Sequence, residues 1–135
     1  MDRQVKGMNI LIVEHDRQEA QRLRKRILKR HHWATMTLSG RAAVKLVSQC
    51  SFDLLLLDIF LPDALGHTLI PEFKALSPQT HIVVMTSYHT CQLEREVRDQ
   101  GIADYLTKPF EMNHLETIMT HLDQRKEGDA NGRDR

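Results

Sequence analysis

The chain has 135 residues, of which 41% are hydrophobic and 27% are charged, and this favours a single globular domain with one core. Its formal net charge of +1 gives no electrostatic argument for nucleic-acid binding. No apolar run approaches the roughly 18 residues that span a bilayer, and the N-terminus lacks the apolar core of a signal peptide. Cys50 and Cys91 lack metal-ligand spacing, so we expect a reducing, cytoplasmic setting without membrane contact.

Short aliphatic runs alternate with amphipathic stretches from the start of the chain. Residues 10–13 predict a buried strand, and Asp16 then offers a helix N-cap with Glu19 three residues later, as in a capping box. Residues 33–38 predict a second strand, which a helix follows. The run FDLLLLD at residues 52–58 is the clearest strand signal, and it ends on a carboxylate.

The alternation continues through the second half of the chain. After the turn-rich stretch LPDALG, the predicted elements are a helix that ends near Leu76, a strand at 81–87, a helix at 91–100, a strand at 103–106 and a helix at 111–124. Residues 125–135 are polar and contain glycine, and we expect them to be disordered. Residues 1–8 are expected to form an N-terminal tail.

Strands that alternate with helices predict right-handed βαβ units, and therefore an α/β domain with a parallel sheet covered on both faces. In such sheets ligands bind beyond the carboxyl ends of the strands. The polar side chains at those ends are Glu14, His15, Asp16, Asp58, Thr86, Ser87 and Lys108. Clustered carboxylates suit a divalent cation such as Mg²⁺, and a lysine and a hydroxyl suit phosphate oxygens. Because an aspartate can also be the nucleophile in phosphoryl transfer, this edge predicts phosphoryl chemistry.

Three segments resemble the receiver domains of two-component response regulators. DIFLPDALG at residues 58–66 is similar to the phosphoacceptor motif of that family. IVVMTSY at 82–88 is similar to the strand that ends in the switch hydroxyl, and ADYLTKPF at 103–110 to the segment with the conformational aromatic and the lysine. The resemblance is greatest to receivers of nitrogen-regulation transcription activators. It implies a doubly wound, flavodoxin-like sheet of five parallel strands in the order 2-1-3-4-5, at residues 9–124.

The resemblance also implies roles for individual side chains. Asp58 would accept a phosphoryl group from the phosphohistidine of a sensor histidine kinase or a phosphotransfer protein. Thr86 would reorient to bind the phosphate, Tyr105 would swing inward behind it, and Lys108 would pair with it. The Lys108–Pro109 peptide bond is expected to be cis.

The metal site departs from the family at one position. Most receivers have two adjacent acids after the first strand, whereas here Glu14 is followed by His15. The implied Mg²⁺ ligands are therefore Glu14, Asp58 and the backbone carbonyl of Phe60, with His15 in place of the direct acid ligand. Three interpretations stay open: a working receiver that binds Mg²⁺ weakly, an imidazole that favours a softer ion, or a site without useful metal binding in which protonated His15 replaces the cation.

Two aromatic side chains bear on the lifetime of a phosphoryl group. In receivers, the positions two past the phosphoacceptor and two past the switch hydroxyl flank the path of the hydrolytic water. Here they are Phe60 and Tyr88, which predicts shielding and slow hydrolysis, unless these residues are simple surface variation.

The first predicted helix is strongly basic. Its cationic residues and the two histidines that follow are Arg17, Arg22, Arg24, Lys25, Arg26, Lys29, Arg30, His31 and His32. This helix can present an ordinary solvated face or a docking surface for an acidic partner.

Signal reception without enzymatic turnover is the expected function. Phosphorylation of Asp58 would bias a surface formed by the fourth helix, fifth strand and fifth helix, through which the domain can also form a homodimer. We expect no direct nucleic-acid contact by this domain. One alternative is a phosphorylation-independent interaction module of the same fold; a remote one is a small metal-dependent phosphatase. The sequence permits both a stand-alone receiver and a fragment of a longer regulator.

Overall fold

The computed structural model describes residues 7–133, and from residue 126 onward only the backbone. Its strands are β1 (Asn9–Val13), β2 (Trp33–Thr37), β3 (Leu54–Asp58), β4 (His81–Thr86) and β5 (Asp104–Thr107). They form one parallel sheet in the order β2-β1-β3-β4-β5, which confirms the predicted topology. Two strands are shorter than predicted: β2 ends at Thr37 instead of residue 38, and β3 begins at Leu54 instead of residue 52.

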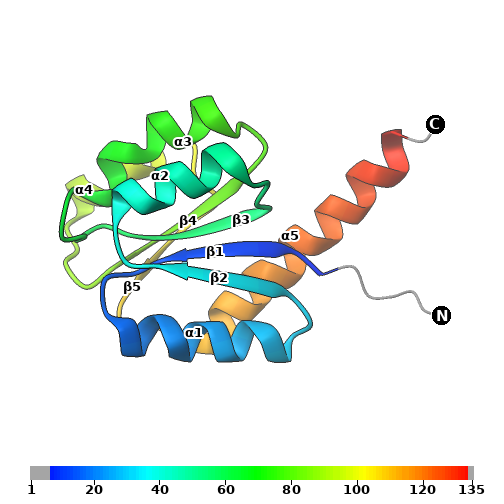
Figure 1. Ribbon diagram of the computed structural model, residues 1–135, viewed down its shortest axis with the longest axis horizontal. Coiled ribbons are helices and arrows are strands. Elements are labelled where there is room, and N and C mark those ends of the chain that lie inside the picture. Colours follow the sequence, from blue (N-terminus) through cyan, green and yellow to red (C-terminus); the bar gives the residue numbers. More distant parts are fainter. Residues whose placement is uncertain (1–6, 134–135) are drawn as a thin grey trace.

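Helices cover both faces of the sheet. They are α1 (Arg17–Lys29), α2 (Gly40–Gln49), the short 3₁₀ helix η1 (Gly66–Leu69), α3 (Ile70–Leu76), α4 (Cys91–Arg98) and α5 (Met112–Arg133). Figure 1 shows α1 and α5 on one side of the sheet and α2, α3 and α4 on the other. No helix in the part of the chain that the structure describes is both long and apolar enough to cross a membrane.

Alternate residues of the central strands supply two separate cores. Ile10 and Ile12 of β1 pack toward the face that α1 and α5 cover, whereas Leu11 and Val13 pack toward α2 and α3. The aliphatic runs lack polar alternation because both faces of these strands are buried.

The first helix begins as predicted, but its capping differs in one respect. The Asp16 carboxylate accepts hydrogen bonds from the backbone N–H groups of Gln18 (3.0 Å) and Glu19 (3.2 Å). In a capping box, the side chain of Glu19 would accept a hydrogen bond from the backbone N–H of Asp16. Here that N–H donates to Glu14 Oε2 (3.1 Å), just after β1, instead. The side chain of Glu19 is thereby free to face Lys108, with Oε1 3.4 Å from Nζ.

The ends of the domain differ from the expected tails. Helix α5 continues to Arg133, past the expected end near Gln124 and through most of the segment 125–135 expected to be disordered. Extending a helix that is already nucleated costs no new nucleation, and no proline interrupts this segment. Met8, within the expected N-terminal tail 1–8, is buried, and its backbone N–H donates to His32 Nδ1 (2.9 Å). Residues 1–6 and 134–135 of these tails lie outside the described residues.

The loop after β3 passes close to Asp58 and is hydrogen-bonded to the start of α2. A Cβ added at Gly66 would lie 2.0 Å from the backbone oxygen of Asp58, so only glycine allows the chain to pass this close to the strand end. The Asp63 carboxylate accepts hydrogen bonds from the backbone N–H groups of Gly40 and Arg41, both at 2.9 Å. These two bonds hold the pKa of Asp63 below its ordinary value.

We expect the Asp63→Asn substitution to lower the melting temperature by a few degrees at pH 7. The folded-state pKa of Asp63 is depressed, so its contribution is present at neutral pH and is lost as the pH falls through that folded pKa. The melting temperatures of wild type and variant, followed by circular dichroism, should therefore converge in acid.

Asp99→Asn is the matched control, because Asp99 is the C-cap of α4, where a carboxylate faces the negative end of the helix dipole. This control should not lower the melting temperature. A constant difference between Asp63→Asn and wild type across the acid range would contradict the assignment.

Candidate functional site

The order of the strands brings the two central acids together. In the register of β1 and β3, Val13 lies opposite Leu57, so Glu14 and Asp58 follow at adjacent strand ends. Both are buried, with exposed fractions of 0% and 2%. Two carboxylates can remain at such a position only with compensating positive charge or hydrogen-bond donors.

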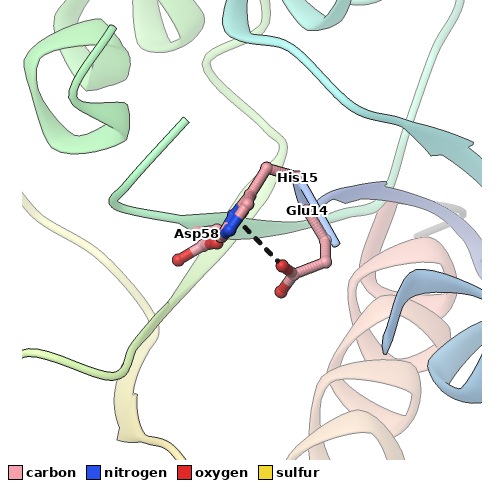
Figure 2. Close-up of side chains that lie close together, drawn as sticks. All are labelled: Glu14, His15 and Asp58. Atoms are coloured by element: carbon pink, nitrogen blue, oxygen red, sulfur yellow. Dashed lines mark hydrogen bonds and ion pairs between the residues drawn. The ribbon is translucent and has the colours of Figure 1, made fainter. Parts of the chain in front are cut away.

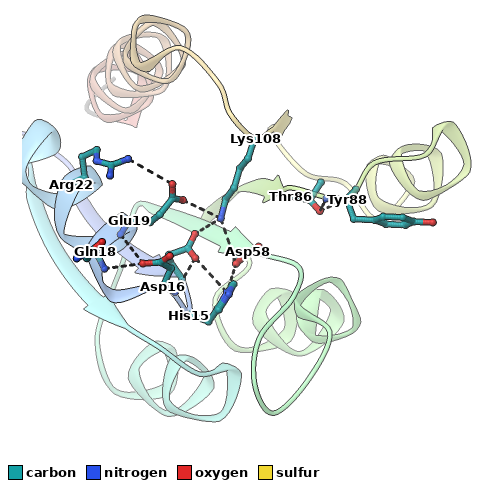
Figure 3. A network of polar contacts seen from close by, with 10 residues as sticks. His15, Asp16, Gln18, Glu19, Arg22, Asp58, Thr86, Tyr88 and Lys108 are labelled. Carbon is teal, nitrogen blue, oxygen red and sulfur yellow. Dashed lines mark hydrogen bonds and ion pairs between the residues drawn. The ribbon is translucent and has the colours of Figure 1, made fainter.

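The ammonium of Lys108, at the loop after β5, supplies that charge. Its Nζ donates a hydrogen bond to Glu14 Oε1 and lies 3.4 Å from Glu19 Oε1 and 3.5 Å from Asp58 Oδ2. Figure 3 shows the Lys108 side chain directed toward Glu19 and Asp58. The lysine side chain is only 14% exposed. Sequence reasoning identified Glu14, Asp58 and Lys108 but missed Glu19, because its spacing from Asp16 fits a capping box equally well.

Burial and charge act in opposite directions on this cluster. Burial raises the pKa of Glu14, and the Asp58 charge raises it further, while the hydrogen bonds from Lys108 and from the Asp16 N–H only partly offset that rise. Burial by itself would lower the pKa of Lys108, but the hydrogen bond to Glu14 and the charges of Asp58, Glu14 and Glu19 together raise it. The lysine is therefore firmly protonated.

His15 faces the same acids from the β1–α1 loop. Its Nδ1 lies 2.9 Å from Asp58 Oδ2 and 3.4 Å from Glu14 Oε2. Figure 2 shows the three side chains gathered together. The imidazole is not enclosed, since 51% of the side chain is exposed. Candidate ligand atoms of Glu14, His15 and Asp58 all lie within 4.8 Å of one another, so the donors fit a divalent cation with one nitrogen and two oxygen ligands.

Thr86 is buried at the end of β4 and hydrogen-bonds to the following loop. Its Oγ1 donates to the backbone oxygen of Tyr88 (2.7 Å) and accepts from the backbone N–H of Tyr88 (3.1 Å). The Tyr88 ring meets the Phe60 ring edge to face, with 6.0 Å between centroids. The two aromatics are 58% and 39% exposed, so they pair at the surface rather than in the core.

Tyr105 of β5 packs inward, with 6% exposure, in the core on the α2–α4 side. Its hydroxyl lies 3.2 Å from His89 Nδ1, and the Arg98 guanidinium carbon lies 6.0 Å from the ring centroid. Burial raises the pKa of the Tyr105 hydroxyl, as does the charge of Glu94. Sequence reasoning missed His89, because no spacing rule links a loop histidine to a tyrosine on a neighbouring strand.

Two further sequence features can be placed. The Lys108–Pro109 peptide bond is cis in this structure. On the basic helix α1, Arg26 pairs with Glu116 of α5 (3.0 Å), and Arg24 Nε donates to the backbone oxygen of Ala34 (2.9 Å). Two of its basic side chains therefore bind neighbouring elements: Arg26 binds α5 and Arg24 binds β2.

Removal of the Lys108 charge should destabilise the fold at neutral pH. We expect Lys108→Met to lower the free energy of unfolding by about 3 kcal/mol, the order of loss when one partner of a buried ion pair is removed. The loss should shrink as the pH falls through the raised pKa of Glu14, because a neutral carboxyl needs no counter-charge.

Urea titrations across this pH range would measure the effect, with Lys45→Met on the exposed surface of α2 as the matched control. Equal losses for the two variants would contradict a central role for the Lys108 charge.

Residues 10–120 match the response regulator receiver domain family. The chain is 32% identical over 106 residues to the response regulator protein FleR of Pseudomonas aeruginosa, which covers 78% of this chain and 22% of FleR. It is 27% identical over 110 residues to the DNA-binding transcriptional regulator NtrC of Azospirillum brasilense, covering 82% of this chain and 23% of NtrC. The chain therefore spans about a quarter of the length of these relatives.

Solved structures of response regulators share this fold. A response regulator protein from Burkholderia pseudomallei, crystallised with a phosphorylated aspartic acid, calcium ion and citrate, superposes with a TM-score of 0.78 at 22% identity. The match covers 92% of this chain and 74% of that one. The family match over most of the chain, together with the sheet order, places this protein among the receiver domains of two-component response regulators.

Proposed function

We propose that this receiver accepts a phosphoryl group on Asp58 from the phosphohistidine of a sensor histidine kinase or a phosphotransfer protein. The observation that carries the proposal is the buried Asp58 carboxylate at the carboxyl edge of the sheet, with the Lys108 ammonium 3.5 Å from Oδ2. The role is signal reception, and the proposal requires no turnover of a small phosphate ester.

The chemistry is a single in-line displacement at phosphorus. An oxygen of Asp58 forms the new bond to phosphorus, the bond from phosphorus to the donor's imidazole nitrogen breaks, and that imidazole leaves with the bonding electron pair and takes up a proton. Lys108 offsets the negative charge on the transferred group. Glu14, Asp58 and the backbone carbonyl of Phe60 would hold a divalent cation, which supplies further charge neutralisation when bound.

We propose that Mg²⁺ binds this site weakly. His15 Nδ1 already occupies the side of Asp58 that carries Oδ2, and an imidazole nitrogen is a poor Mg²⁺ ligand. Lys108 donates to one oxygen of Glu14 and the Asp16 N–H to the other, so a cation at Glu14 shares the carboxylate with these donors. The Burkholderia protein was crystallised with both a phosphorylated aspartic acid and a calcium ion, which supports a role for a divalent cation.

The proposed switch begins at Thr86. To bind the phosphoryl group, its hydroxyl must exchange the Tyr88 backbone for a phosphate oxygen. Tyr105 is already packed inward, so the change would pass to α4, β5 and α5 through the Tyr105–His89 contact. We propose that partners bind this surface and that it forms the homodimer interface. We propose a cytoplasmic location, and no direct contact of this domain with nucleic acid or membrane.

One observation favours a second function. The His15–Asp58 contact already gives the phosphoacceptor a partner without a metal ion. A receiver in this state would act as a phosphorylation-independent interaction module.

Intact-mass spectrometry after incubation with acetyl phosphate and Mg²⁺ separates the two functions. We expect one phosphoryl adduct on the wild type and none on Asp58→Asn, because the adduct forms on that carboxylate. His15→Asp should reach half-maximal phosphorylation at a Mg²⁺ concentration at least about tenfold lower, because replacing a metal ligand changes affinity by at least as much as replacing its neighbours.

An adduct on His15→Asp but none on wild type would instead establish the interaction module. Circular dichroism of all three proteins is the control for folding.

The Phe60–Tyr88 pair should slow hydrolysis of the acyl phosphate. Truncation of both rings in Phe60→Ala/Tyr88→Ala should shorten its half-life roughly tenfold, which corresponds to about 1.4 kcal/mol in the barrier. The decay of the phosphorylated protein after removal of acetyl phosphate would measure this.

Trp33→Ala is the matched control, because Trp33 is 69% exposed on the edge strand β2. A half-life of seconds in the wild type, or equal half-lives in wild type and double variant, would reject shielding.

A further inference from the structure

Three donor atoms of the site are already spaced like ligands of one metal ion. His15 Nδ1 lies 2.9 Å from Asp58 Oδ2 and 3.4 Å from Glu14 Oε2. Ligands that bind a first-row dication at about 2.0–2.2 Å lie about 3.0 Å apart at right angles and about 3.4 Å apart at the tetrahedral angle. The two separations from His15 Nδ1 fall within this pattern, and candidate ligand atoms of all three residues lie within 4.8 Å of one another, so a single ion can contact the three side chains after local adjustment.

The donor set differs from an all-oxygen magnesium site. Mg²⁺ is a hard cation that takes oxygen ligands and gives up its water reluctantly. An imidazole nitrogen strengthens the binding of first-row transition dications, whose affinities rise from Mn²⁺ toward Cu²⁺. One imidazole nitrogen from the half-exposed His15, with carboxylate oxygens from the buried Glu14 and Asp58, is the kind of ligand set that such ions accept.

We propose that His15 makes this receiver select a first-row transition dication over Mg²⁺, with Glu14, His15 and Asp58 as its protein ligands. The inference deepens the proposed function and rests on it in one respect: the selected ion would be the one that assists phosphorylation of Asp58.

The surroundings orient these ligands. The Asp16 N–H donates to Glu14 Oε2 at 3.1 Å and Lys108 binds the other oxygen, so the Glu14 carboxylate is held from two sides. His15 needs no such support to reach the site, because its Nδ1 already faces Asp58. Metal binding through Nδ1 requires the tautomer with its proton on Nε2. Without metal, the same Nδ1 can instead donate a hydrogen bond to Asp58, and the experiment must separate these two roles.

Pulsed electron paramagnetic resonance of bound Mn²⁺ distinguishes a nitrogen ligand from a hydrogen bond. We expect the full chain loaded with Mn²⁺ to show coupling to a directly bound ¹⁴N nucleus. The coupling should disappear in His15→Asp and persist in His114→Asp, the same change at an exposed histidine of α5. Because His15 lies half-exposed in a loop, circular dichroism should show that His15→Asp remains folded.

Competition between the two ions gives the selectivity. The Mg²⁺ concentration that displaces half of the bound Mn²⁺ should be at least about tenfold lower in His15→Asp than in the wild type, the loss expected when a ligand is replaced. Absence of ¹⁴N coupling in the wild type, or the same Mg²⁺ requirement in both proteins, would overturn the inference.

Phosphorylation is scored separately, by intact mass after incubation with acetyl phosphate. An Asp58 adduct without ¹⁴N coupling to Mn²⁺ rejects the metal selectivity and keeps the proposed receiver function. Coupling to ¹⁴N without an Asp58 adduct at any metal concentration rejects the proposed phosphorylation and keeps the nitrogen-containing metal site.

Discussion

The pairing of the Lys108 ammonium with buried carboxylates is the interaction on which the site depends. Adjacent parallel strands force Glu14 and Asp58 to the same edge of the sheet, where both are almost fully buried. Burial and the charge of Asp58 raise the pKa of Glu14, and the Lys108 ammonium partly offsets that rise. Lys108 reaches them from β5, two strands away from β3, and so couples the acids to the segment that also carries Tyr105.

His15 brings a second nitrogen to the same site, and we propose that it changes which ion the acids bind. Lys108 lies toward Glu14 and Glu19, whereas His15 lies on Asp58 Oδ2, so the two side chains approach the pocket from different sides (Figure 3). A metal ion at the acids therefore has to accept the imidazole as a ligand or displace it from Asp58. In the first case His15 sets the choice of ion; in the second it raises the concentration of Mg²⁺ that is needed. Both consequences follow from the position of the His15 imidazole beside Asp58.

Local patterns in the sequence predicted the parallel α/β sheet and the central acids, whereas the strand order came from the resemblance to receiver domains. Aliphatic runs such as residues 54–57 specify buried strands, and strand ends in a parallel sheet must meet at one edge. The remaining details depend on contacts between distant segments. Glu19 faces Lys108 only because Glu14 takes the Asp16 N–H, and His89 meets Tyr105 across 16 positions of sequence. The polar composition after Gln124 also favoured disorder, but α5 continues through this segment to Arg133, because extending an existing helix needs no new nucleation.

Tyr88 links the proposed switch to the lifetime of the signal. The hydroxyl that must turn toward a phosphoryl group, that of Thr86, is bound to both backbone groups of Tyr88, while the Tyr88 ring packs on Phe60. Reorientation of Thr86 therefore removes two hydrogen bonds that hold the Tyr88 backbone. Tyr105 requires no such exchange, because it is already inside. In the proposed switch the structural cost therefore falls on the loop that carries Tyr88, so a change that loosens Tyr88 would act on the proposed switching and the proposed shielding together.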